Sequence, residues 1–186
     1  MPEEIAHNHQ PVYRIALASY NDPLDASYSR GRSDNRWNPP DSFDVLYTSC
    51  SERVAGAVLR DRFRLTAVLI GDLSDERIPH LCEIEWRGSA VDVISSAGLV
   101  AAGLAEGYPV GVDKAATQAK GAGWHKEGRE AVVARSMSLA RLGIVDWSGD
   151  HAGWGELAIF VDNAKVKPVL RRRREDLEWL IAVPEA

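Results

Sequence analysis

The chain has 186 residues, of which 45% are hydrophobic and 26% charged, and its formal net charge is −5. This length suits one well-buried core and is short for two, so we expect a single domain. The acidic balance argues against a nucleic-acid-binding protein, and no apolar run reaches the roughly 18 residues that a membrane span needs.

The N-terminal residues predict neither export nor a metal site. Met-Pro-Glu-Glu lacks the basic and apolar regions of a secretory signal, and the two cysteines, Cys50 and Cys82, lie far apart. These features favour a reducing cytoplasm. We expect residues 1–10 to be a flexible terminus, residues 11–186 to form the single domain, and no metal to bind.

The first regular element is a predicted strand over residues 11–18, rich in apolar and β-branched side chains. Arg14 interrupts this apolar run. It must pair with a carboxylate, point into a cleft, or lie in water at a sheet edge, and the sequence leaves these alternatives open. Asn21-Asp22-Pro23 then signals a turn.

The segment 29–40 contains Arg30, Arg32 and Arg36 together with a glycine, a tryptophan and a Pro-Pro pair. A segment so rich in turn residues is expected outside the core, and an apolar strand is predicted directly after it, over 45–49. Arginines on a loop beside a strand end are suited to phosphate or carboxylate groups, because the guanidinium fork can make two parallel charge-assisted hydrogen bonds. A solvated surface loop is the alternative.

The remaining chain alternates short strands and helices. Hydrophobic spacing predicts helices over 51–63 and 113–126, strands over 65–70, 81–86, 131–136, 157–161 and 166–170, polar loops over 71–79 and 146–155, and an undecided segment over 90–107. Ser51 and Asp113 are the expected N-caps. The four arginines at 171–174, followed by acidic residues, are interpreted as the solvated start of a helix over 175–183. The pattern predicts a single α+β domain with a mixed β-sheet core and flanking helices.

Common catalytic motifs are missing. The sequence has no Walker loop, no Gly-x-Ser-x-Gly elbow, no His-Glu-x-x-His and no Cys-x-x-Cys pair. What remains is a set of arginines, aromatics and a serine at predicted strand ends. That set suits a ligand with phosphates and a flat ring.

The order of several short blocks resembles the RES-domain family, which comprises toxins of bacterial toxin–antitoxin modules related in fold to ADP-ribosyltransferases. The resemblance extends from about residue 12 to residue 161, and its most specific part is the block from Arg-Trp-Asn-Pro-Pro to Leu-Tyr. The blocks are Val-Tyr-Arg (12–14), Asn-Arg-Trp-Asn-Pro-Pro (35–40), Val-Leu-Tyr-Thr-Ser (45–49), a helix ending in Asp-Arg-Phe-Arg (61–64), Ala-Thr-Gln (116–118), Arg-Ser (135–136) and Gly-Glu-Leu-Ala-Ile-Phe (155–160).

This resemblance implies an ADP-ribosyltransferase-like fold and an enzyme that uses NAD⁺ as its substrate and breaks the nicotinamide–ribose bond. By match, Arg14 and Arg36 would hold phosphate or ribose, with Arg32 as a further cofactor-binding residue. Tyr47 would orient the nicotinamide end, and Ser136 would hydrogen-bond the ribose or the amide.

The chain departs from the family at one position. The resemblance implies a glutamate on the helix after Tyr47, about a dozen residues further along, but Ala57 and Val58 stand there. A missing carboxylate would remove stabilisation of a cationic transition state. Three explanations stay open: the chain is an inactivated variant, the carboxylate comes from elsewhere, or the protein binds without turnover.

Two functions follow from these observations. The first is a toxin that degrades NAD⁺ with water or phosphate, or transfers ADP-ribose to a protein such as phosphoribosyl pyrophosphate synthetase. Its expected partner is a helix-turn-helix antitoxin whose C-terminal segment covers the cleft, with no direct contact to nucleic acid or membrane. The second is a non-catalytic module that binds a nucleotide or a peptide.

Overall fold

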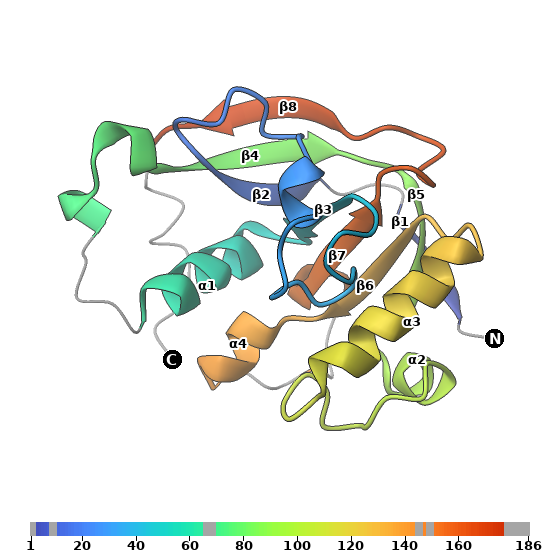
Figure 1. The fold of residues 1–186 in the computed structure, drawn as a ribbon. Coiled ribbons are helices and arrows are strands. Elements are labelled where there is room, and N and C mark those ends of the chain that lie inside the picture. The colour runs from blue at the N-terminus through green and yellow to red at the C-terminus, as the bar shows by residue number, and fades with distance from the viewer. Residues whose placement is uncertain (1–2, 8–10, 65–69, 144–146, 148–150, 177–186) are drawn as a thin grey trace.

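The computed structural model describes residues 3–7, 11–64, 70–143, 147 and 151–176. Eight strands form one mixed sheet in the order β1-β5-β6-β7-β3-β2-β4-β8 (Figure 1). Of the neighbouring strands, β5 and β6 run parallel and the others antiparallel. The strands are β1 (Glu4–His7), β2 (Val12–Leu17), β3 (Val45–Ser49), β4 (Pro79–Glu85), β5 (Gly88–Val93), β6 (Ala131–Arg135), β7 (Gly155–Phe160) and β8 (Val169–Arg174).

Helices flank this sheet, so the predicted α+β domain is confirmed. The described residues include the α-helices α1 (Glu52–Phe63), α2 (Ser96–Ala101), α3 (Lys114–Lys126) and α4 (Met137–Arg141). The two predicted N-caps are present: the Ser51 hydroxyl accepts from the backbone N–H of Val54, and the Asp113 carboxylate accepts from that of Ala115. None of the helices in the described ranges is long and apolar enough to cross a bilayer.

The sheet opens between β2 and β3. These strands pair at one position, Tyr13 with Ser49, whereas β2 pairs with β4 along its whole length and β3 does the same with β7. In Figure 1, β2, β4 and β8 run together at the top, and β3, β7 and β6 turn away from them towards α3 and α4. The separation leaves a space bordered by both strands.

Alternating side chains build the core on both faces of the sheet. Leu46 and Leu157 belong to a cluster on one face. Val45 and Phe160 belong to a cluster on the other face, which Trp124 of α3 covers. Helix α1 packs against β2 and β4 through a smaller cluster that contains Ala55, Leu59 and Leu81. Both faces are therefore buried close to the opening.

Three segments differ from the sequence predictions or refine them. Residues 4–7, expected in a flexible terminus, form the edge strand β1 and pair with β5. The undecided segment 90–107 contains most of β5 and all of α2. The predicted strand over 65–70 and the predicted helix over 175–183 fall largely or wholly outside the described residues, although Ile70 begins a short 3₁₀ turn.

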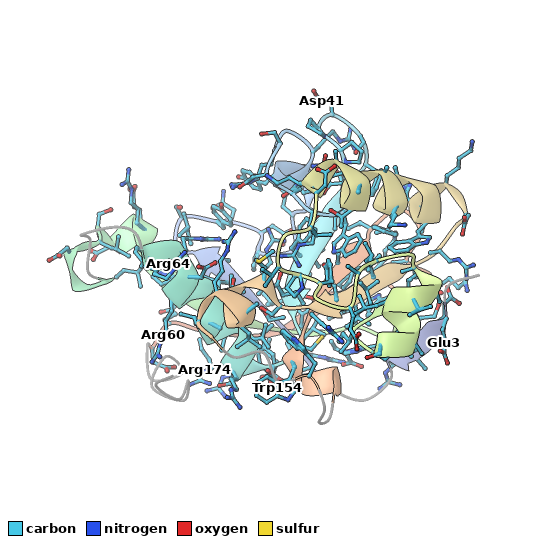
Figure 2. The ribbon with its side chains drawn as sticks, turned by 90° about the horizontal axis from the view of Figure 1, so that it is seen from below. Glu3, Asp41, Arg60, Arg64, Trp154 and Arg174 are labelled. Atoms are coloured by element: carbon cyan, nitrogen blue, oxygen red, sulfur yellow. The ribbon has the colours of Figure 1, made fainter. Side chains whose placement is uncertain are left out.

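The four arginines at 171–174 were wrongly assigned to a helix start: they belong to strand β8. A strand places alternate side chains on opposite faces, so each arginine meets different partners. Arg173 donates to His80 and to the carbonyl oxygens of Leu17, Ala18 and Tyr20. Arg174, at the lower edge of Figure 2, binds Glu52 at 3.1 Å. These contacts hold the edge strand in place, and they are not available to a solvated helix.

Gly121 tests how closely α3 packs against the backbone of Trp37. A Cβ at this position would overlap the backbone carbonyl of Trp37, whereas Gly123, two residues along the same helix, faces open space. We expect Gly121→Ala to lower the free energy of unfolding by about 1–3 kcal/mol through overpacking. Gly123→Ala should raise it by about 0.5–1 kcal/mol, because alanine favours the helix. Urea unfolding of both variants measures the difference, and equal effects would contradict this packing.

Candidate active site

Two adjoining cavities occupy the opening between β2 and β3, and we call them together the cleft. The larger, of about 260 Å³, is bordered by Arg14 and Ile15 of β2, Tyr47 of β3 and Val58 of α1, among others. The smaller, of about 170 Å³, is bordered by Arg36 and Trp37. Four residues line both cavities: Asp34, Asn35, Tyr47 and Glu156.

Arg14 places a cationic group in the cleft. Its Nη1 atom is buried and makes no hydrogen bond to any described residue. Burial lowers the pKa of this guanidinium, and nearby Tyr20 opposes the shift, yet an arginine stays charged at neutral pH. Of the alternatives that the sequence left open, the cleft is the one observed. A buried donor that lacks an acceptor carries a desolvation penalty, and a ligand atom that accepts its hydrogen bond would remove that penalty.

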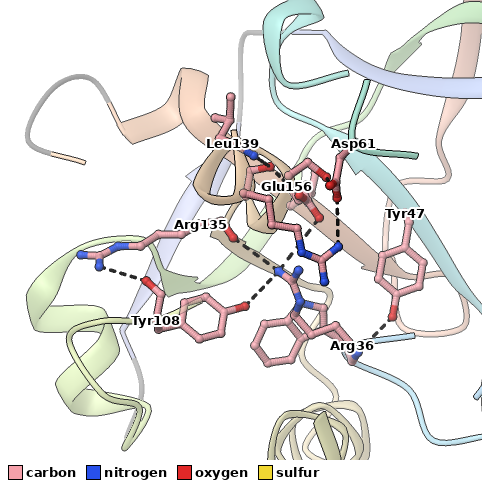
Figure 3. Close-up of polar contacts among 12 residues, drawn as sticks. Arg36, Tyr47, Asp61, Tyr108, Arg135, Leu139 and Glu156 are labelled. Carbon is pink, nitrogen blue, oxygen red and sulfur yellow. Dashed lines mark hydrogen bonds and ion pairs between the residues drawn. The ribbon is translucent and has the colours of Figure 1, made fainter. Parts of the chain in front are cut away.

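Arg36 is held in a polar network at the other end of the cleft. Its Nη1 donates to the Tyr108 hydroxyl at 3.2 Å and to the Arg135 carbonyl oxygen at 3.4 Å, and lies 4.0 Å from Glu156 Oε2 (Figure 3). Burial acts to lower the pKa of Arg36, but Tyr108 and Glu156 together outweigh it and the pKa is raised. Arg36 is therefore a fixed charge at the wall of the smaller cavity.

The hydroxyl of Tyr47 holds the segment 29–40, the arginine loop, which carries Arg30, Arg32 and Arg36. It accepts from the backbone N–H of Trp37 at 3.0 Å and donates to the Asn38 side chain at 2.8 Å. Burial raises the pKa of Tyr47, so the phenol stays neutral. Trp37 and Asn38 are buried, which corrects the expectation that the whole of 29–40 lies outside the core. The physical reason is that Trp37 packs on Trp124 while Asn38 satisfies backbone groups of the loop.

Glu156 brings a carboxylate into the cleft from β7. Its Oε1 atom accepts from the Ser136 hydroxyl at 2.5 Å. Ser136 itself is fully buried, lines neither cavity, and caps α4 by accepting from the Leu139 N–H. Ser136 therefore does not border the cleft and is linked to it by the hydrogen bond to Glu156.

Comparison with known proteins identifies the fold family. Residues 11–179 match the family described as RES domain, which is most of the chain. The chain belongs to the RES-domain family. It is also similar to a chain in the crystal structure of the M. tuberculosis MbcT–MbcA toxin–antitoxin complex, with a TM-score of 0.64 and 20% identity over 88% of this chain and 82% of that one. No curated protein matches it.

The two positions at which a RES-domain glutamate was expected, 57 and 58, have different surroundings. Ala57 is fully buried and packs with Val54 and Leu139 between α1 and α4. Val58 borders the larger cavity. Of the two, Val58 is therefore the residue that borders the cleft, and its side chain is apolar.

Arg32 and Arg30, the other two arginines of the segment 29–40, form ion pairs at the surface. Arg32 borders the larger cavity but forms an ion pair with Asp34 through both of its forked nitrogens. Arg30 binds Asp44 at 3.0 Å. Both arginine side chains are more than half exposed, so these pairs contribute little to stability. Of the predicted site residues, Arg14, Arg32, Arg36 and Tyr47 lie at the cleft.

Sequence reasoning missed four residues at or beside the cleft. Glu156 was quoted only within the block 155–160 and was given no role, because the predicted strand began at residue 157, whereas strand β7 begins at Gly155. Tyr108 lies far from Arg36 in sequence, and nothing in its local pattern predicts their contact. Tyr20 and Tyr28 stack in parallel at 5.1 Å and both border the larger cavity. Their ring faces could not be placed before the turn between them was known.

Removal of the Tyr47 hydroxyl tests whether it holds the loop. We expect Tyr47→Phe to lower the free energy of unfolding by about 1–3 kcal/mol, because the buried Trp37 N–H loses its acceptor. The control is Tyr28→Phe, at a ring that is 55% exposed, which should change stability by less than about 0.5 kcal/mol. Urea unfolding of both variants decides the matter, and a Tyr47→Phe protein as stable as the control would refute this role.

Proposed function

We propose that this RES domain is the toxin of a toxin–antitoxin pair and that it consumes NAD⁺ by cleaving the nicotinamide–ribose bond. The observation that carries the proposal is the buried Arg14 Nη1 atom, which has no hydrogen-bond acceptor among the described residues. It lies in a cleft that also presents tyrosine rings and the carboxylates of Asp34 and Glu156. The cavities together fall within the roughly 300–1,000 Å³ of small-molecule sites.

The side chains of the cleft suit the pyrophosphate and a base of a dinucleotide. A pyrophosphate is matched by Arg14, whose buried N–H groups can make charge-assisted hydrogen bonds. The rings of Tyr20 and Tyr28 offer apolar surface for a base at the mouth of the larger cavity. NAD⁺ combines these features with a leaving group that departs without a charge.

Cleavage of the nicotinamide–ribose bond requires stabilisation of positive charge. The bonding electron pair leaves with the nicotinamide nitrogen, and the ribose becomes an oxocarbenium-like cation. A site accelerates this step by placing fixed negative charge where the cation develops. The acceptor is water, phosphate or a protein side chain, and the co-product identifies which.

The proposed partner is an antitoxin that closes the cleft. The solved structure to which this chain is similar is that of a toxin–antitoxin complex. An arginine-bearing cleft favours a blocking segment with acidic side chains or a terminal carboxylate, because complementary charge steers association and fixes register.

A non-catalytic nucleotide- or peptide-binding module is the second candidate. Val58 favours it, because the α1 wall of the larger cavity carries no ionisable group at this position. This alternative predicts NAD⁺ binding without nicotinamide release.

Chromatography of a reaction of the purified chain with NAD⁺ tests the proposal. We expect free nicotinamide to accumulate, together with ADP-ribose in water or a phosphorylated product when phosphate is the acceptor. Heat-denatured protein serves as the blank. Bound NAD⁺ that stays intact in water, in phosphate and with added protein acceptors would favour the binding module.

The role of Arg14 can be measured by calorimetry. Arg14→Met keeps much of the side-chain length but removes the charge, and we expect it to weaken NAD⁺ binding by roughly 10–100-fold, the loss of a charge-assisted contact. Arg172→Met is the matched control, because Arg172 lies exposed on β8 and outside the cleft. Equal effects of the two substitutions would mean that Arg14 does not contact the ligand.

A further inference from the structure

We infer that Glu156 is the catalytic carboxylate of this cleft, supplied from strand β7 instead of helix α1. This inference rests on the proposed function, since it names the group that stabilises the ribose cation. It also predicts that the chain cleaves NAD⁺ as it stands, with valine at position 58.

The sheet register places Glu156 beside the opening. Tyr13 pairs with Ser49, and Ser49 pairs with Glu156, so the three side chains form one row on the same face of the sheet. All three border the larger cavity together with Val58. Glu156 therefore borders the same cavity that a carboxylate at position 58 would border.

The contacts of Glu156 fix one oxygen by a short hydrogen bond and leave the other in a longer ion pair. Oε1 accepts from the Ser136 hydroxyl at 2.5 Å, and Oε2 lies 4.0 Å from Arg36 Nη1. The side chain keeps 23% of its surface exposed. A carboxylate that is held by its neighbours but still open to a ligand needs little reorganisation during a reaction.

The other acid of the cleft is already engaged. Asp34 uses both carboxylate oxygens to bind Arg32, and its side chain is 58% exposed. A closely paired and solvated carboxylate stabilises a cation weakly, because the neighbouring guanidinium and water screen its charge. Glu156 also lies near a guanidinium, that of Arg36, but at 4.0 Å and with a side chain that is 23% exposed, so its charge is screened less than that of Asp34. Among the described residues that border the cleft, Glu156 is the acid suited to the reacting carbon.

The proposed step balances with water as the acceptor. The bond between ribose C1′ and the nicotinamide nitrogen breaks, and the electron pair leaves with neutral nicotinamide. Glu156 stabilises the resulting cation by charge, as carboxylates do in glycoside hydrolysis. The water oxygen then forms a bond to C1′ and one proton passes to solvent, so NAD⁺ and water yield ADP-ribose, nicotinamide and a proton.

Glu156→Gln tests the inference with little change of shape, since the amide oxygen can still accept from Ser136. We expect kcat for nicotinamide release to fall about 100–1,000-fold, the loss seen when one preorganised electrostatic group is removed. KM and NAD⁺ affinity should stay within about threefold. The control Glu127→Gln removes an exposed acid outside the cleft and should leave kcat unchanged. Unchanged turnover in Glu156→Gln would overturn the inference and leave the proposed function intact.

A carboxylate introduced on α1 separates failure of the inference from failure of the proposed function. Val58→Glu in the Glu156→Gln protein should raise kcat at least tenfold above that of the Glu156→Gln protein, because both positions border one cavity. An unsubstituted chain that binds NAD⁺ but is inert, beside an active Val58→Glu chain, would overturn the role of Glu156 alone. Folded but inert proteins in both forms would refute NAD⁺ cleavage, and with it the inference.

Discussion

The separation of β2 from β3 is the constraint on which the site depends. Adjacent strands in a sheet normally close against each other through a full ladder, but here the ladder ends after Tyr13 and Ser49. Pairing of β2 with β4 and of β3 with β7 satisfies the opposite edges of both strands and keeps each in place. The gap between them admits side chains from both faces of the sheet, as Arg14 and Ile15 show. A polar cleft can therefore exist inside a well-packed domain.

Arginines serve two distinct purposes in this structure. Arg36, Arg135 and Arg173 donate to backbone carbonyl oxygens and so tie loops and an edge strand to the sheet. Arg14 differs, because one of its buried nitrogens has no acceptor in the described part of the chain. A buried donor without an acceptor costs about 1–3 kcal/mol. That cost is most simply explained by a ligand that supplies the acceptor.

Local patterns predicted the elements well and the site only in part. The helices after Ser51 and Asp113 were predictable because capping and helical spacing are properties of adjacent residues. The strand role of the arginines at 171–174 was not, because it depends on carbonyl groups of Leu17 and Ala18 far back in the chain. Glu156 was missed for the same reason. Its place at the cleft depends on sheet register, which the residues around it do not encode.

The proposed reaction requires that the ribose of NAD⁺ lies against Glu156 in the opening of the sheet. The most direct measurement is a crystal structure of the chain with a carbocyclic NAD⁺ analogue, whose nicotinamide bond cannot be cleaved. We predict the pyrophosphate on Arg14 and the carbon that corresponds to C1′ in van der Waals reach of the Glu156 carboxylate, about 3–4 Å. An analogue bound outside the cleft, or with its nicotinamide end turned away from Glu156, would contradict the account.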